Sequence, residues 1–189
     1  MITVIGLGNP GKEYEQTRHN AGRSAAMRFA KYFEFPEFEL NKKANALISE
    51  GKIKKERVSV ILPETFMNKS GSAAGKLFRA KKENKELIVI HDDLDLPLGK
   101  IKISYGKNSG GHKGVESVMR ALKTKNFVRI RIGICPKRKP GHREQMKFIV
   151  GKWRLTEQAI IKKSFKRASQ ALETIITDSL DRAMSEYNK

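Results

Sequence analysis

His19 is the side chain of this sequence best suited to acid–base chemistry at neutral pH, because an imidazole ordinarily titrates in that range. It follows a loop of glycine, asparagine and proline at residues 6–11, which ends a short apolar run at residues 2–5. That run has the β-branched composition of a buried strand, and its abrupt end in a polar loop is typical of a site at the edge of a sheet. We therefore expect the other functional side chains to converge on His19.

A second group of ionisable side chains, His91, Asp92, Asp93 and Asp95, comes directly after the apolar run at residues 87–90. Clustered carboxylates can hold a hard cation. Aspartates at a strand end also cap and turn the chain, and one aspartate can orient a catalytic histidine. The sequence leaves these three interpretations open, although it shows neither calcium-loop spacing nor a second carboxylate cluster.

No serine or cysteine lies in a Gly-x-Ser-x-Gly elbow, the pattern that presents the nucleophile of many hydrolases. If this chain is a hydrolase, water is therefore the expected nucleophile. The other histidines, His91, His112 and His142, each have a simpler interpretation as structural residues with satisfied hydrogen bonds.

The Gly6-x-Gly8-x-x-Gly11 pattern formally matches the fingerprint of dinucleotide-binding proteins. However, Pro10 stands where that loop should enter the phosphate-binding helix, and the following residues show no helical apolar stripe. No acidic residue ends a clear second strand about 20 positions further on, as ribose recognition requires. A nucleotide-dependent oxidoreductase is therefore a minor alternative, which failure to bind NAD or NADP would dismiss.

These groups must be positioned by alternating strands and helices. Apolar and alternating patterns predict strands at residues 2–5, 44–51, 57–62, 87–90, 100–105 and 128–134. Apolar residues at helical spacing predict helices at residues 21–33, 66–78, 114–122 and from 155 onward. This order predicts an α/β fold, a single domain over residues 1–189 with a twisted sheet flanked by helices on both faces. The strand pair within 44–62 and a hairpin expected near 88–105 predict a mixed sheet.

The chain carries a formal charge of +19, from 39 lysines and arginines against 20 acidic residues. Such an excess attracts polyanions and releases counterions on binding, so a nucleic acid is the expected partner. A solvated basic surface without a partner is the alternative.

The cysteine content and the lack of targeting segments indicate the compartment. Cys135 is the single cysteine, which excludes an intrachain disulfide and a cysteine-based zinc cage. The N-terminus lacks a signal-peptide pattern, and no apolar run approaches the ~20 residues of a membrane span. We therefore expect a soluble, cytoplasmic protein.

Several ordered motifs make the sequence similar to bacterial peptidyl-tRNA hydrolases, and the resemblance covers nearly the whole chain. The motifs are Gly6-Leu-Gly-Asn-Pro-Gly11 with Tyr14, Thr17-Arg-His-Asn-Ala-Gly22, Phe66-Met-Asn-Lys-Ser-Gly71, His91-Asp-Asp-Leu-Asp-Leu-Pro97, Gly110-Gly-His112, Arg129-x-Arg-Ile-Gly133 and Val150-Gly-Lys152. At matching separations they form a specific signal that no single motif provides.

The resemblance implies an α/β monomer that hydrolyses the ester between peptide and tRNA without a metal or cofactor. It implies that His19 is the general base on water and that Asp92 accepts a hydrogen bond from its imidazole. Asn68 would hold the substrate carbonyl or the attacking water, and Asn9 would bind the 3′ end or the peptide. These roles suit the chemistry, because an imidazole with a pKa of about 6.5 can accept a proton and an amide can donate to an oxyanion.

The resemblance further implies a set of substrate contacts. Tyr14 would position the terminal nucleotide, and Arg131 with neighbouring lysines would grip phosphates near the acceptor end. The backbone amides of the helix that begins near Gly114 would serve the same purpose. Further contacts expected from the motifs are Phe66, Gly111, His112 and Lys113, and those expected from charge are Lys100, Lys102, Lys137, Arg138 and Lys139.

One residue departs from the family pattern. Where Gly-Gly-His-Asn-Gly is expected, this chain has Gly110-Gly-His-Lys-Gly114. Lysine only donates hydrogen bonds and is cationic, whereas asparagine also accepts them. An inward Lys113 ammonium would lower the pKa of His19, whereas an outward one would add a phosphate contact. We expect the outward arrangement, because lysine keeps its charged head in water.

The main alternative function is a non-catalytic RNA-binding protein of the same fold, since related plant organellar proteins are thought to serve intron splicing. The departure at Lys113 gives this alternative some weight. The presence of His19, Asp92, Asn68 and Asn9 favours catalysis, because the chain keeps every expected acid–base and amide group.

Overall fold

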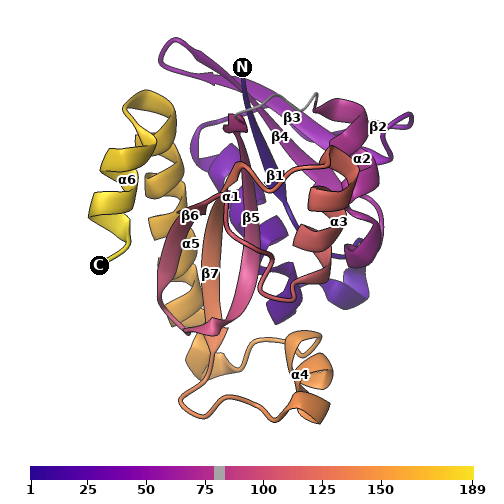
Figure 1. Ribbon diagram of the computed structural model, residues 1–189, viewed down its shortest axis with the longest axis vertical. Coiled ribbons are helices and arrows are strands. Elements are labelled where there is room, and N and C mark those ends of the chain that lie inside the picture. Colours follow the sequence, from indigo (N-terminus) through magenta and orange to yellow (C-terminus); the bar gives the residue numbers. More distant parts are fainter. Residues whose placement is uncertain (79–83) are drawn as a thin grey trace.

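The structure, a computed structural model, describes residues 1–78 and 84–189. In these ranges a seven-stranded sheet lies between helices on both faces (Figure 1). The strands are β1 (Ile2–Gly6), β2 (Glu39–Asn41), β3 (Ala46–Ile53), β4 (Glu56–Pro63), β5 (Asn84–Pro97), β6 (Ile101–Tyr105) and β7 (Phe127–Cys135). The α-helices are α1 (Ala21–Tyr32), α2 (Gly71–Leu77), α3 (Lys113–Leu122), α4 (His142–Ile149), α5 (Leu155–Thr177) and α6 (Leu180–Tyr187). Short 3-10 helices are η1 (Lys12–Tyr14), η2 (Arg18–Asn20) and η3 (Met67–Lys69).

The strand order β2-β3-β4-β1-β5-β7-β6 makes β1 and β5 central. β1 pairs in parallel with β4 and β5, and β5 pairs in parallel with β7. The pairs β2–β3, β3–β4 and β6–β7 are antiparallel, so the predicted mixed α/β sheet is confirmed. The carboxyl ends of β1, β5 and β7 therefore meet at one edge, where open α/β sheets commonly bind ligands.

Side chains of the central strands alternate between two apolar cores. Val4 and Ile88 belong to the core that the sheet forms with α1 and α5. Ile5 and Val89 belong to the core on the opposite face, with α2 and α3. Strands buried on both faces are fixed by packing from two sides, which gives the site at their ends a rigid base.

The prediction of a hairpin near residues 88–105 is wrong. β5 already has β1 and β7 on its two edges, so β6 pairs with β7 instead. Gly99, with φ +96°, allows the turn that leads from β5 into β6. The alternating sequence of β6 correctly predicts one buried face, but alternation alone does not identify the neighbouring strand.

The helices differ from the sequence-based prediction in three places. The helix predicted at 66–78 is divided into η3 and α2. The helix predicted from 155 onward ends at Thr177, and the Ser179 side chain caps a separate α6 by accepting the backbone N–H of Arg182. The third difference is α4, a short helix that the sequence analysis does not predict and none of whose residues is buried.

A glycine lets the first turn of α1 lie against the end of β5. A Cβ at Gly22 would lie 2.2 Å from the carbonyl oxygen of Ile90, so only glycine permits this approach. The same carbonyl accepts the backbone N–H of Leu7 at 3.0 Å. The loop after β1, the turn before α1 and the end of β5 are thereby held together, which brings His19 next to Asp92.

We expect Gly22→Ala to lower the free energy of unfolding by about 2 kcal/mol or more, because a backbone carbonyl has little room to move. Gly75→Ala is the matched control, since Gly75 is also helical and its Cβ would lie 3.6 Å from the nearest atom, in Ala121. That change should be neutral or stabilise by up to about 1 kcal/mol. Urea unfolding measures both, and equal stabilities of the two variants would contradict the close approach.

Candidate active site

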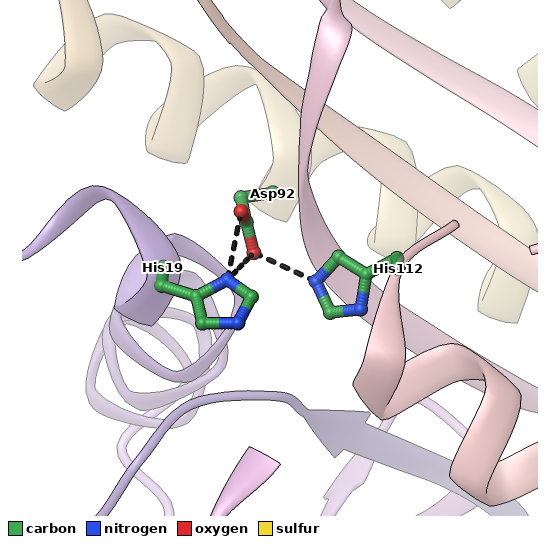
Figure 2. Close-up of side chains that lie close together, drawn as sticks. All are labelled: His19, Asp92 and His112. Atoms are coloured by element: carbon green, nitrogen blue, oxygen red, sulfur yellow. Dashed lines mark hydrogen bonds and ion pairs between the residues drawn. The ribbon is translucent and has the colours of Figure 1, made fainter. Parts of the chain in front are cut away.

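The imidazole of His19 and the carboxylate of Asp92 form a buried pair where the carboxyl ends of β1, β5 and β7 meet. His19 lies in η2, directly before α1, and Asp92 lies in β5 beyond Ile90, the partner of the last residue of β1. Nδ1 of His19 is 3.0 Å from each carboxylate oxygen. A carboxylate only accepts, so Nδ1 carries the proton and Nε2 keeps its lone pair on the side of the ring away from Asp92 (Figure 2). This is the geometry of a base and the group that orients it.

A second imidazole donates to the same carboxylate. Nε2 of His112 is 2.8 Å from Oδ1 of Asp92 (Figure 2). His112 is also the N-cap of α3, and its Nδ1 accepts the backbone N–H of Val115 at 3.3 Å. The proton of the neutral ring is therefore on Nε2. Asp92 thus joins the turn before α1 to the first turn of α3.

These side chains shift one another's pKa values. Burial disfavours the charged form of His19, but the Asp92 carboxylate and its hydrogen bond outweigh burial and raise the pKa of His19. Burial also disfavours the charged form of Asp92, but His19 and His112 outweigh it and hold the pKa of Asp92 far below its usual range. Asp92 is therefore an anion at neutral pH and stabilises the imidazolium that His19 becomes when it accepts a proton.

A fully buried histidine holds the backbone of β5 behind this pair. Nδ1 of His91 donates to the carbonyl oxygen of Asp92 at 2.7 Å, and Nε2 faces Nη1 of Arg129 at 3.5 Å. Burial, together with His112 and Arg129, lowers the pKa of His91 well below its ordinary value, so this ring is neutral. Burial and the neighbouring Arg131 lower the pKa of Arg129 to about 10, so the guanidinium stays charged at neutral pH.

Asn9 is fixed by hydrogen bonds to two other elements. Its backbone N–H donates to Oδ1 of Asn20, and its carbonyl oxygen accepts from Nδ2 of Asn20, both at 2.9 Å. Oδ1 of Asn9 accepts the backbone N–H of Met67 at 2.8 Å, so Nδ2 is the donor left for a ligand. Asn68, the next residue of η3, is exposed, and its side chain forms no hydrogen bond with another described residue.

Two aromatic rings connect the loops that carry these amides. Tyr14 in η1 and Phe66, directly before η3, meet edge to face with ring centroids 6.4 Å apart. Phe66 is 58% exposed. An exposed aromatic ring beside polar side chains offers a surface that a base or an apolar side chain can cover.

The expected basic contacts fall in two separate hollows. Lys102 on β6 and Arg131 on β7 are register partners, and with Arg129 they line a hollow of about 390 Å³. Nε of Arg131 donates to the Asp93 carboxylate at 2.6 Å. Residues 137–139 line a different hollow of about 1540 Å³, between the loop before α4, α4 and the start of α5.

The remaining expected contacts lie in exposed turns or at a helix end. Lys100 lies in the turn between β5 and β6, and Gly111 lies directly before His112 with φ +80°. The side chain of Lys113 is 69% exposed, and its ammonium pairs with Glu116 at 3.4 Å. This is the outward arrangement expected for Lys113, so the lysine in the asparagine position leaves the histidine–carboxylate pair intact.

The hydrogen bonds do not fit a resident metal, although the ligand atoms of His19, Asp92 and His112 lie within 4.8 Å of one another. A metal-bound histidine ordinarily donates its other N–H to an acceptor. Nδ1 of His112 instead accepts the backbone N–H of Val115, which leaves the ring proton on the nitrogen that would bind the metal. Asp93, which follows Asp92 in the sequence, forms an ion pair with Arg131 and not with these histidines. His19, Asp92 and His112 therefore form a hydrogen-bonded network.

Sequence reasoning misses three contributions to this site. Asn20 orients Asn9, and Arg18 anchors the turn of His19 by bonding to Glu157. The bond from His112 to Asp92 is the third, because His112 is expected only as a substrate contact. Arg18 and Asn20 belong to the Thr-Arg-His-Asn motif, which signals their importance, but nothing in the spacing identifies their partners.

The fold is an α/β domain, and its candidate site holds an imidazole oriented by a buried carboxylate, with amide side chains nearby. This arrangement suits a hydrolase that uses acid–base chemistry. The family model for peptidyl-tRNA hydrolase matches residues 3–189, and this chain belongs to that family. It is 37% identical to the peptidyl-tRNA hydrolase of Thermodesulfovibrio yellowstonii and 38% identical to that of Dehalococcoides mccartyi, with full coverage of both chains in each case. The crystal structure of peptidyl-tRNA hydrolase from Acinetobacter baumannii matches with a TM-score of 0.90 at 28% identity, over 100% of this chain and 94% of that one.

We expect Asp92→Asn to lower the pKa of His19 below its ordinary value of 6.5, since burial then acts without the opposing carboxylate. The ring signals of His19 in an NMR pH titration measure this shift. Asp93→Asn is the matched control, because that neighbouring carboxylate pairs with Arg131 and should leave the His19 midpoint unchanged. An unchanged midpoint in Asp92→Asn as well would show that Asp92 does not hold the imidazolium.

Proposed function

We propose that this chain hydrolyses the ester that joins a peptide to the 3′ ribose of tRNA, which releases the tRNA for reuse. Membership of the peptidyl-tRNA hydrolase family supports this reaction. The observation that carries the proposal is the His19–Asp92 pair. Nδ1 of His19 faces the carboxylate, and Nε2 of the same ring lies on the side away from it. The amides of Asn9 and Asn68 supply donors from the neighbouring loops.

In the proposed reaction, Nε2 of His19 takes a proton from water while the water oxygen attacks the ester carbonyl carbon. Asp92 stabilises the resulting imidazolium, and amide N–H groups of Asn9 or Asn68 donate to the carbonyl oxygen as it becomes negative. The tetrahedral intermediate then collapses and the carbon–oxygen bond to the ribose breaks. The imidazolium returns its proton to the ribose oxygen. His112 supports this step through Asp92, and its contact with the substrate stays a prediction.

The surfaces around the pair suit the 3′ end of an RNA. Tyr14 and the exposed Phe66 offer ring faces on which a base can stack, a contact worth about 1–3 kcal/mol. Lys102 and Arg131 line a basic hollow beside the strand that carries Asp92, and we assign them to phosphates near the acceptor end. Lys100 and the loop at 137–139 extend this charge, which positions RNA without reading its sequence.

The partner is peptidyl-tRNA, and we propose, as the family resemblance implies, that the protein acts as a monomer. Its substrate is a product of translation, which places the proposed action in the cytoplasm. Within the described ranges, no helix combines the length and the apolar character needed to cross a membrane.

The two alternative functions fit the site less well. A non-catalytic RNA-binding protein has no need of a buried anion that orients an imidazole, yet the His19–Asp92 pair is complete. In a dinucleotide-binding fold the glycine loop leads straight into a helix, whereas here η1 and η2 separate Gly11 from α1.

The reaction is tested with N-acetylaminoacyl-tRNA, with free aminoacyl-tRNA as the control substrate and excess chelator in both. We expect cleavage of the blocked substrate alone, with no effect of the chelator. His19→Ala should reduce kcat by at least about 100-fold, the usual contribution of a general base. Tight, salt-sensitive binding of tRNA by the wild-type protein without cleavage would instead establish the RNA-binding alternative.

We expect Lys113→Asn to change kcat by no more than about threefold, because the exposed ion pair with Glu116 contributes little. The same blocked substrate measures the change. Glu116→Gln is the matched control, since it breaks the same ion pair without altering residue 113. A gain in kcat of tenfold or more in Lys113→Asn alone would show that the ammonium enters the site.

A further inference from the structure

Arg18 is a buried cation directly beside the proposed base, and the reaction described above gives it no part. Its residue is only 4% exposed. It lies in the same 3-10 helix, η2, as His19 and Asn20. Because η2 is a single short turn, whatever anchors Arg18 also constrains the imidazole of the next residue.

The guanidinium of Arg18 joins the end of α4 to the start of α5. Nη1 donates to the carbonyl oxygens of Lys152 at 3.0 Å and Phe148 at 3.4 Å. Nη2 forms an ion pair with Glu157 at 2.6 Å. The guanidinium carbon also lies 4.2 Å from the ring centroid of Phe148 and 5.4 Å from that of Trp153. This set of contacts needs a planar fork of donors that also stacks on rings, which lysine does not provide.

The backbone of the same turn is tied to the segment between α4 and α5. The N–H of Arg18 donates to the carbonyl oxygen of Gly151, and the N–H of Trp153 donates to that of Gln16, both at 3.1 Å. A Cβ at Gly151 would lie 3.0 Å from Nη1 of Arg18 and 3.1 Å from the carbonyl oxygen of Phe148, so glycine leaves room for the guanidinium. This junction explains the Val-Gly-Lys motif, which has no part in the proposed chemistry.

The element that Arg18 ties to the active site is α4. Figure 1 shows α4 at one end of the molecule, outside the layers of sheet and helices, and none of its residues is buried. Lys147 on α4 and residues 137–139 of the preceding loop line the same hollow of about 1540 Å³. An exposed element with this charge is suited to bind RNA phosphates, and its low burial allows it to shift when it does so.

We infer that Arg18 is a positioning residue that couples RNA bound against α4 to the alignment of His19, an inference that rests on the proposed function. RNA that fixes α4 also fixes the carbonyl oxygen of Phe148, to which Arg18 donates. The arginine then holds η2, and η2 holds the imidazole in line with Asp92 and the ester. Since a displacement of ~1 Å can cost ~100-fold in rate, a small shift of this turn is sufficient.

The test compares two substrates that carry the same N-acetylaminoacyl group, one on full-length tRNA and one on the trinucleotide CCA. The trinucleotide lacks the acceptor stem, so it presents far fewer phosphates to α4 and the preceding loop than tRNA does. In the wild-type protein, kcat should be at least tenfold higher on tRNA. Arg18→Lys should remove this advantage, by lowering kcat on tRNA at least tenfold while changing kcat on the trinucleotide less than threefold.

Two further variants make the test specific. Glu157→Gln keeps the shape of the side chain that pairs with Arg18 but removes its charge. It should therefore also reduce the advantage of tRNA over the trinucleotide in kcat. If Arg18→Lys does not melt cooperatively, Glu157→Gln tests the coupling in its place. Arg167→Lys is the matched control, because Arg167 lies on α5 and stacks on Tyr187 at 5.6 Å, a residue of α6. It should leave kcat on both substrates unchanged.

The outcomes separate the coupling from other roles of Arg18. An equal loss of kcat on both substrates would show that Arg18 supports the fold of η2 alone and would overturn the inference. A rise in KM for tRNA at constant kcat would also overturn it, since Arg18 would then serve RNA binding only. A wild-type protein that cleaves neither substrate would contradict the proposed function itself, which is a different result.

Discussion

The site depends on one buried carboxylate, that of Asp92. A carboxylate at 3% exposure is strongly destabilised unless donors surround it, and here two imidazole N–H groups supply them. The donors come from separate elements, His19 from the turn before α1 and His112 from the N-cap of α3. Each bond also settles a tautomer, because the nitrogen that faces the carboxylate must carry the proton. Asp92 thereby leaves Nε2 of His19 as the nitrogen that can accept a proton, and it makes α3 part of the same network.

That network can form only because backbones meet at distances that exclude any side chain. A Cβ at Gly22 would lie 2.2 Å from the carbonyl oxygen of Ile90, and one at Gly71 would lie 2.0 Å from that of Ser117. The first contact places α1 against β5, and the second places α2 against α3. Donors held by such contacts do not need to reorganise when charge develops, which is the usual source of electrostatic catalysis.

The sequence predicts the parts of this structure that depend on local patterns. It does not predict which segments that are distant in the chain pair with one another. Apolar runs and helical spacing locate the central strands and α1, and the family motifs point to the pairing of His19 with Asp92. The pairing of β6 with β7 is not predictable from alternation, which specifies a buried face but no neighbour. The bonds of His112 to Asp92 and of Arg18 to Glu157 are likewise missed, because they join residues far apart in the sequence.

The side chains of the candidate site divide into those fixed by hydrogen bonds to buried partners and those exposed at the surface. The first set bonds to buried partners: His19 to Asp92, and Asn9 to the backbone N–H of Met67. The second set is exposed and includes Asn68 and Lys113. A substitution in the first set breaks hydrogen bonds within the protein, whereas one in the second set leaves those buried hydrogen bonds in place. Lys113, found where the family resemblance predicts asparagine, lies in the second set, so this departure leaves the buried hydrogen bonds among His19, Asp92 and His112 unchanged.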